Sequence, residues 1–295
     1  MADTTGAVVV GIDGSDIAIA AARWAGAVAT RIGAPLHIVH AMPSLGRNLT
    51  DAAAAIRAAI MSYQADSSQI FLADAADAVR AAWPDLRIDT ESHSEPADRA
   101  LIEASRTARL IVLGGNELSA ARALLLGSTT LAVATHAHCP VVAWRGGAAA
   151  PGRDPIVVGV DGSAHGQVAL EAAFELAEAF DVPVRAVRSW TAALPPGAPA
   201  IPFVVDWEAL EAAQLTELVE TVDAVNKRHP GVRAECHLEH EGPARALLQH
   251  AATAQLIVVG TRGRNALAGA LLGSTSLNLL QHSTIPVMVC HAEGD

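Results

Sequence analysis

The chain has 295 residues, of which 51% are hydrophobic and 17% charged, and its formal charge at pH 7 is −11. This composition is typical of a globular protein, and the length is sufficient for two domains. The negative charge disfavours nucleic acid and anionic membrane as partners. Neither a signal-peptide pattern nor a bilayer-length apolar run is apparent, so we expect a cytoplasmic protein. Three cysteines without a CxxC pair indicate reduced thiols.

Short apolar runs alternate with helical patterns along the first half of the chain. The predicted strands cover 7–12, 36–41, 86–93, 110–113 and 140–144. The predicted helices cover 18–31, 50–82 with an interruption at 62–68, 97–106 and 128–135, while 118–126 is a loop or a short helix. Continuous runs of Val, Ile and Leu are typical of parallel strands buried on both faces. Their alternation with helices predicts a doubly wound α/β sheet.

The same pattern returns in the second half, which indicates a duplicated domain. VVVGIDGS at 8–15 returns as IVVGVDGS at 156–163, and LLGST at 125–129 returns at 271–275. The second set of strands is expected near 155–160, 182–189, 231–239, 255–260 and 285–290. We therefore predict two tandem doubly wound domains, 1–146 and 153–295, each an open five-stranded parallel sheet flanked by helices. A linker at 146–152 joins them, and the irregular stretch 192–203 is expected to be a loop over the second site.

Ligands of such sheets bind beyond the carboxyl ends of the strands, where the winding direction reverses. In the second copy Asp161 follows the first strand there, and Gly260 to Gly263 follow the fourth. Gly273 then begins a helix, whose free amides favour phosphate. Arg262 and Arg264 could supplement this anion site. The Asp161 carboxylate, across the crevice, can accept hydrogen bonds from two ribose hydroxyls. The end of the second strand can contact a base through its backbone.

The spacing G-x2-G-x9-G-[ST], together with an Asp-Gly-Ser after the first strand, resembles the universal stress protein family in its tandem two-domain form. The resemblance implies bound ATP, with or without Mg²⁺, and pairing of the last strands, 141–144 and 287–290, between the two domains. Those strands are apolar and would otherwise lie open at a sheet edge. It also suggests a homodimer. The nucleotide contacts expected in the second copy are Asp161, Gly162, Ser189, Gly260, Arg262, Gly263, Gly273, Ser274, Thr275 and Ser276.

The first copy carries a less complete version of this motif. Its corresponding residues are Asp13, Gly14, Ala41, Gly114, Gly127, Ser128, Thr129 and Thr130. Glu117 stands where the second copy has Gly263, and Asn116 and Leu118 replace the two arginines. A carboxylate in place of a loop glycine restricts the backbone and repels phosphate. We therefore expect the first copy to bind nucleotide weakly or not at all.

Other interpretations of these residues stay open at this stage. Asp13 and Asp161 could cap helices as well as bind ribose. The cluster of His136, His138 and Cys139 favours packing over a metal site, and His237 and His240 favour solvated surface, so no metal is predicted.

No catalytic residue is predicted either, because the chain lacks a P-loop, a G-x-G-x-x-G opening and a nucleophile elbow. The function indicated is an ATP-binding, nucleotide-responsive regulator of the stress or dormancy response. The alternatives are a slow ATPase or adenylate-using enzyme, and an interaction protein with vestigial sites.

Overall fold

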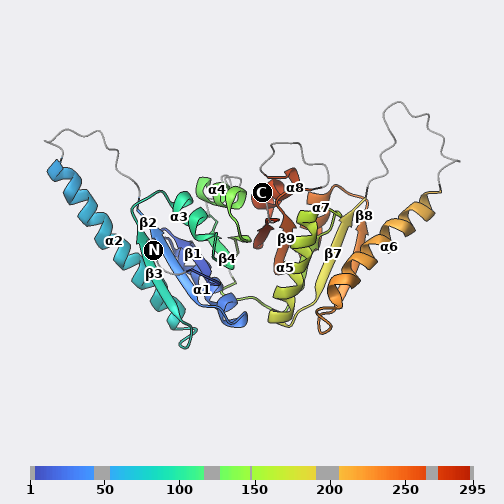
Figure 1. Ribbon diagram of the computed structural model, residues 1–295, viewed down its shortest axis with the longest axis horizontal. Coiled ribbons are helices and arrows are strands. Elements are labelled where there is room, and N and C mark those ends of the chain that lie inside the picture. The colour runs from blue at the N-terminus through green and yellow to red at the C-terminus, as the bar shows by residue number, and fades with distance from the viewer. Residues whose placement is uncertain are drawn as a thin grey trace, which may run out of the picture.

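A computed structural model of the chain describes residues 4–42, 54–115, 127–146, 148–190, 206–263 and 272–292, with the side chains of 54–61 left out. The predicted loops at 118–126 and 192–203, Glu117 and Arg264 lie outside these residues. Within them the chain is an α/β protein in which the same order of elements occurs twice (Figure 1). The elements of the first half are β1 (Val8–Ile12), α1 (Asp16–Arg31), β2 (Leu36–Ala41), α2 (Ala54–Arg80), β3 (Ile88–His93), α3 (Ala97–Ala104), β4 (Leu110–Gly114), α4 (Ser128–His136) and β5 (Val141–Trp144).

The second half repeats this order after a short connection. Its elements are β6 (Ile156–Gly159), α5 (Ala164–Phe180), β7 (Val184–Ser189), α6 (Trp207–Asn226), β8 (Ala234–Glu239), α7 (Pro243–Ala251), β9 (Leu256–Gly260), α8 (Ser274–His282) and β10 (Val287–Cys290). The predicted α/β class with parallel strands and flanking helices is confirmed. No described helix is long and apolar enough to cross a bilayer.

The strands of both halves form one sheet instead of two separate ones. Its order is β3-β2-β1-β4-β5-β10-β9-β6-β7-β8, and the pairs within each half are parallel. The exception is the seam, where β10 runs antiparallel to β5 and Met288 lies opposite Val142. The last strands therefore occupy the centre of the sheet, and the open edges belong to β3 and β8.

Two apolar cores cover the sheet, and each of them extends across both halves. One core joins α1, α2, α5 and α6 to one face, and the other joins α3, α4, α7 and α8 to the opposite face. Val142 and Met288 belong to the first core, whereas Val141 and Val289, one position along each strand, belong to the second. Because neither core stops at the seam, the halves share their hydrophobic stabilisation.

Polar contacts across the seam repeat in pairs, as expected for a duplicated fold. Arg145, just after β5, donates hydrogen bonds to the carbonyls of Gln281 and Ser283 at the end of α8. His291, just after β10, contacts the carbonyl of Ala134 near the end of α4 through Nε2, 3.1 Å away. Each half thus binds the last turn of the other half's final helix, which is where helical carbonyls lack internal partners.

The helix α2 differs from the sequence-based expectation, because it continues through 62–68 without the predicted interruption. Ser68 is fully buried in it, and Leu72, Ala75 and Val79 continue its buried face. Packing of this face onto the sheet outweighs the weak helix preference of the serines.

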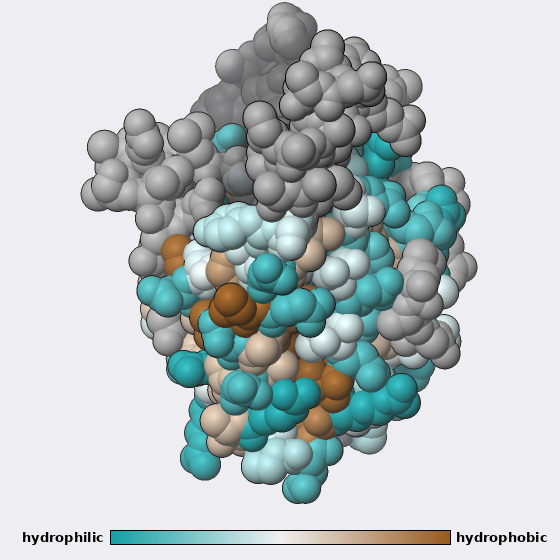
Figure 2. Space-filling model, turned by 90° about the vertical axis from the view of Figure 1, so that its left-hand side faces the viewer, coloured by the Kyte–Doolittle hydropathy of each residue, from teal (hydrophilic) through white to brown (hydrophobic). Residues whose placement is uncertain are grey.

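The outer end of the sheet beside α2 and β3 has a mostly hydrophilic surface with small, separate hydrophobic areas (Figure 2). The edge strand β3 carries Asp89 and Glu91 at this end, and the edge strand β8 at the opposite end carries Glu235 and Glu239. Charged side chains on an edge strand oppose pairing with another sheet.

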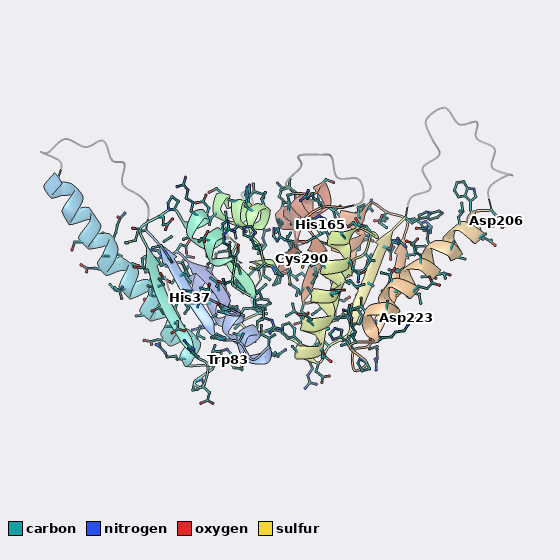
Figure 3. The ribbon with its side chains drawn as sticks, viewed as in Figure 1. His37, Trp83, His165, Asp206, Asp223 and Cys290 are labelled. Atoms are coloured by element: carbon teal, nitrogen blue, oxygen red, sulfur yellow. The ribbon has the colours of Figure 1, made fainter. Side chains whose placement is uncertain are left out.

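The three cysteines are free, and two of them are deeply buried. Burial raises the pKa of the Cys139 thiol to about 12 and raises that of Cys290, which lies near the middle of the molecule (Figure 3). Cys236 is half-buried, and burial raises its pKa too. The thiolate is the reactive form. We therefore expect a thiol reagent at pH 8 to label Cys236 slowly and the other two only after denaturation. Mass spectrometry of labelled peptides checks this, and rapid native labelling of Cys139 would contradict it.

Candidate functional site

A pocket of about 480 Å³ opens at the carboxyl ends of β6, β7 and β9. It brings together nine of the ten residues predicted for the second copy, and these are Asp161, Ser189, Gly260, Arg262, Gly263, Gly273, Ser274, Thr275 and Ser276. Gly162 lies next to it, in the turn that leads into α5. The sheet topology explains this convergence, because the turns after neighbouring parallel strands meet at one edge.

Asp161 shapes this turn and also faces the glycine loop. Its Oδ1 accepts hydrogen bonds from the Ser163 amide at 2.9 Å and the Ser163 hydroxyl at 2.6 Å. Gly162 has a φ of 78°, a left-handed conformation that favours glycine. The helix cap is Ser163, whose hydroxyl accepts from the Gly166 amide, so the capping alternative for Asp161 is wrong. The cap of α1 is likewise Ser15, whose hydroxyl accepts from the Ala18 amide, and not Asp13, which accepts from the Ser15 amide.

The loop after β9 passes directly over the second carboxylate oxygen of Asp161. A Cβ atom added to Gly263 would lie 2.8 Å from Asp161 Oδ2, closer than side chains approach one another. Gly260, at the end of β9, has a packing role. An added Cβ there would meet the backbone of His165 at the start of α5, so this glycine allows β9 and α5 to pack closely (Figure 3).

Hydrogen bonds close the base of the loop where it meets α8. The Gly273 amide donates to the Thr261 carbonyl at 2.6 Å, and the Ser276 hydroxyl donates to the Gly260 carbonyl at 2.7 Å. Ser276 is buried and lines the pocket, and its hydroxyl supports the loop through this hydrogen bond. Gly273 caps α8 without a side-chain hydrogen bond, and Ser274 and Thr275 of its first turn, whose amides lack helical partners, line the pocket.

Sequence reasoning missed several lining residues, of which Arg188 is the most informative. It lies in β7 and is almost fully buried, yet its guanidinium reaches the pocket and pairs with Glu217 of α6 at 2.8 Å. Its presence inside a largely buried strand could have identified it as a functional residue, because arginine is rarely buried without a partner. Trp190, Gln214, Pro243 and Leu247 also line the pocket. The Trp190 ring packs against the rings of Trp207 and His240.

The first half places its predicted residues at the matching end of the sheet, with one clear difference. Asp13 Oδ1 accepts from the Ser15 amide, and Gly14 has a φ of 83°. His40 and Phe71 stand where the second half has Arg188 and Glu217, and their rings meet edge to face at 5.4 Å. A Cβ on Gly14 would lie 2.7 Å from the Phe71 ring. An aromatic ring therefore covers the turn that an ion pair borders in the second half.

The remaining first-half residues occupy the positions expected from the duplication. Gly114 ends β4 against Ile17 and Ala18 of α1, and Gly127 caps α4 without a side-chain hydrogen bond. Ala41 ends β2. The first turn of α4 contains Ser128, Thr129 and Thr130, the last of them buried.

The histidines that were predicted not to bind a metal lie on or beside helices and the edge strand β8. His136 and His282 each contact the carbonyl four residues earlier in their helix, Ala132 and Asn278. His240 is exposed, as expected, but His237 is half-buried within β8 and packs against His250. The prediction that His237 is solvated therefore holds in part, since its side chain is 36% exposed. The α7 helix covers this face of the edge strand, which a strand pattern alone does not reveal.

These features define a doubly wound α/β protein with a polar crevice at the topological switch point of its second half. Comparison with known proteins identifies the family to which this fold belongs. The universal stress protein family model matches residues 5–145 and again 152–291. A universal stress protein of Mycolicibacterium smegmatis is 32% identical over 289 residues, covering 96% of each chain, and one of Mycobacterium tuberculosis H37Rv is 33% identical over 291 residues, covering 96% of this chain and 95% of its own.

The fold also resembles a solved structure, that of a universal stress protein from Archaeoglobus fulgidus. The TM-score is 0.74 at 19% identity, over 97% of this chain and 98% of the other. The chain belongs to the universal stress protein family, with two copies of the family domain in tandem.

Proposed function

We propose that this universal stress protein binds ATP in the second-half pocket and that the bound nucleotide changes what the protein contacts. The observation that carries the proposal is the convergence of Asp161, the Gly260–Gly263 turn and the start of α8, which has no side-chain cap, around one cavity. Helix-end amides favour phosphates, and a carboxylate opposite them favours ribose hydroxyls. Mg²⁺, if it accompanies the nucleotide, would bind with the phosphates.

The pocket also offers groups for the rest of a nucleotide. Arg188 and Arg262 place two guanidinium groups in the lining of the pocket, in a chain whose net charge is −11. Trp190 at the end of β7 offers a flat apolar ring where the base is expected. We propose no catalytic residue, since none of the described side chains that line the pocket is placed as a nucleophile with its own general base.

The proposal predicts one strong ATP site per chain. Isothermal titration calorimetry should give a stoichiometry near one, because His40 and Phe71 crowd the first-half turn. Asp161→Ala should lower the affinity about 10-fold by removing a charge-assisted ribose contact, worth about 1.5 kcal/mol. Asp13→Ala is the matched control and should leave the affinity unchanged. Two equivalent sites, or full affinity in Asp161→Ala, would contradict the proposal.

The homodimer remains a proposal. Because β5 and β10 pair with each other within the chain and the outer edge strands carry charged side chains, a second copy would have to use another surface, such as the helices. Sedimentation equilibrium with and without ATP would test both the dimer and its dependence on the nucleotide.

A further inference from the structure

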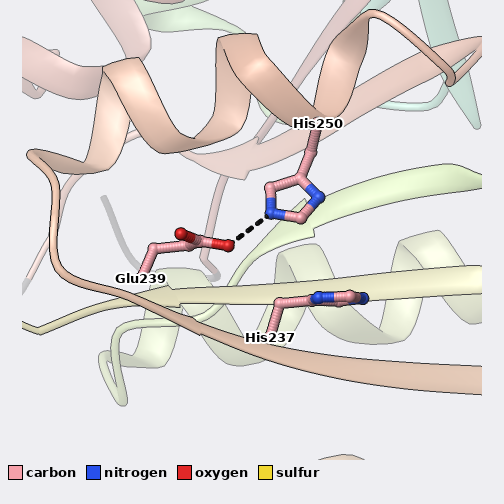
Figure 4. Close-up of side chains that lie close together, drawn as sticks. All are labelled: His237, Glu239 and His250. Carbon is pink, nitrogen blue, oxygen red and sulfur yellow. Dashed lines mark hydrogen bonds and ion pairs between the residues drawn. The ribbon is translucent and has the colours of Figure 1, made fainter.

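A second group of polar side chains lies on the edge strand β8, outside the nucleotide pocket. His237 and Glu239, two residues apart, project from the same face of β8, and His250 reaches them from the last turn of α7 (Figure 4). One ligand atom from each side chain lies within 4.8 Å of the others. Two imidazoles and one carboxylate form a donor set that binds Zn²⁺ and related divalent ions.

The distances fit such an ion with small side-chain adjustments. Glu239 Oε1 lies 2.8 Å from His250 Nε2, and the rings of His237 and His250 have their centroids 4.8 Å apart. Ligands of a tetrahedral zinc ion lie about 3.3 Å from one another, which follows from metal–ligand bonds of about 2.0–2.1 Å. The Nε2 atom of His237 is buried without a hydrogen bond among the described residues, and the carboxylate oxygen Oε2 of Glu235 lies 3.7 Å from it.

The surrounding charges leave Glu239 available to a cation. Arg185 of β7 pairs with Glu235 at 3.5 Å and also binds Thr253, while Arg245 of α7 pairs with Glu241 at 2.9 Å. The two neighbouring arginines are therefore directed at the other carboxylates. Glu239 itself is paired with an imidazole, a group that can bind a metal when neutral.

Among the residues that the structure describes, this set of three potential ligands occurs in the second half alone. Ile88 and Ala234 occupy equivalent register positions, so Glu91 and His93 match His237 and Glu239. Pro96 and Gly242 cap equivalent helices, and the position matching His250 is then Ala104. The first half has a different arrangement, in which Glu91 lies 3.4 Å from the buried His37 and 3.6 Å from His93, and it provides a natural comparison.

From this geometry we propose that His237, Glu239 and His250 bind one divalent transition-metal ion of the zinc class. Three protein ligands that are each 15–36% exposed leave a fourth position open to water. The ion would link the edge strand to α7. Ser189, the register partner of Glu239, and Pro243 and Leu247 of α7 all line the nucleotide pocket, so the ion would lie behind one of its walls.

The test uses the full chain without an affinity tag, stripped with a chelator and free of nucleotide. Titration with Co²⁺, followed by its visible absorption, and then with Zn²⁺ by calorimetry should show one ion per chain. His250→Ala and Glu239→Gln should each weaken binding at least about 10-fold. Glu239→Gln keeps a hydrogen-bond partner for His250, which separates loss of metal from loss of folding. Circular dichroism verifies that both variants fold.

The control is His240→Ala, which removes an exposed histidine just beyond β8 and should leave binding unchanged. The proposal is overturned if binding is below stoichiometric, or if both His250→Ala and Glu239→Gln bind as the wild type does. Loss of binding in His37→Ala with full binding in His250→Ala would place the ion in the first half, and this would overturn it too.

Discussion

Gly263→Glu is expected to weaken ATP binding by about 100-fold, a loss of about 2.7 kcal/mol. The new Cβ would lie 2.8 Å from Asp161 Oδ2. Asp161 cannot turn away without cost, because Ser163 holds its other oxygen through two hydrogen bonds. The added carboxylate would also stand beside another carboxylate in a pocket that is expected to hold phosphates. Calorimetric titration with ATP measures the effect.

The matched control is Gly231→Glu. It introduces the same charge in the turn between α6 and β8, where an added Cβ meets nothing within 4 Å. We expect wild-type affinity and wild-type stability from this variant. If Gly263→Glu keeps its affinity while the control does too, the glycine loop does not contact the nucleotide. If both variants lose affinity, overall charge explains the loss and the steric argument fails.

Gly263→Glu also copies the first half's sequence into the second, since Glu117 occupies the matching position. The structure supplies a separate reason for asymmetry, the contact of Phe71 with His40 and Gly14. If Gly263→Glu abolishes binding altogether, the loop difference alone suffices to inactivate a site. Residual binding would assign part of the asymmetry to the aromatic pair.

Most of the fold could be predicted from the sequence because its signals are local. Runs such as 110–113 are apolar throughout and are followed by glycine, which identifies a buried parallel strand and its end. The site residues next to these ends could be predicted for the same reason. The duplication then fixed which positions correspond, so that each expectation about one half applied to the other.

The remaining features depend on contacts between distant segments, which periodicity does not encode. The buried Ser68 within α2 follows from packing on the sheet, and the position of Arg188 in the pocket requires Glu217 of α6 as its partner. Likewise, His250 becomes part of a cluster only because α7 crosses over β8. The continuous sheet follows from the antiparallel pairing of β5 with β10 and not from either half alone.

Met288→Asp is expected to destabilise both halves together, by roughly 3–5 kcal/mol. Met288 is 3% exposed, lies opposite Val142 across the seam and is paired with Val258 on its other side. A carboxylate there would be buried among apolar side chains, where it must either stay protonated or remain without a partner. A loss of this size is a large fraction of the stability of a typical protein.

Differential scanning calorimetry distinguishes shared from separate stabilisation. Because both cores extend across the seam, the wild type should melt in one transition, and Met288→Asp should lower that transition by about 10 °C. Met288→Leu conserves volume and polarity and should cost less than about 1.5 kcal/mol. A variant that splits into two transitions, one of them at the wild-type temperature, would mean that each half is stable alone. The seam would then join two independent domains, and a ligand in the second-half pocket could not stabilise the first through the shared cores.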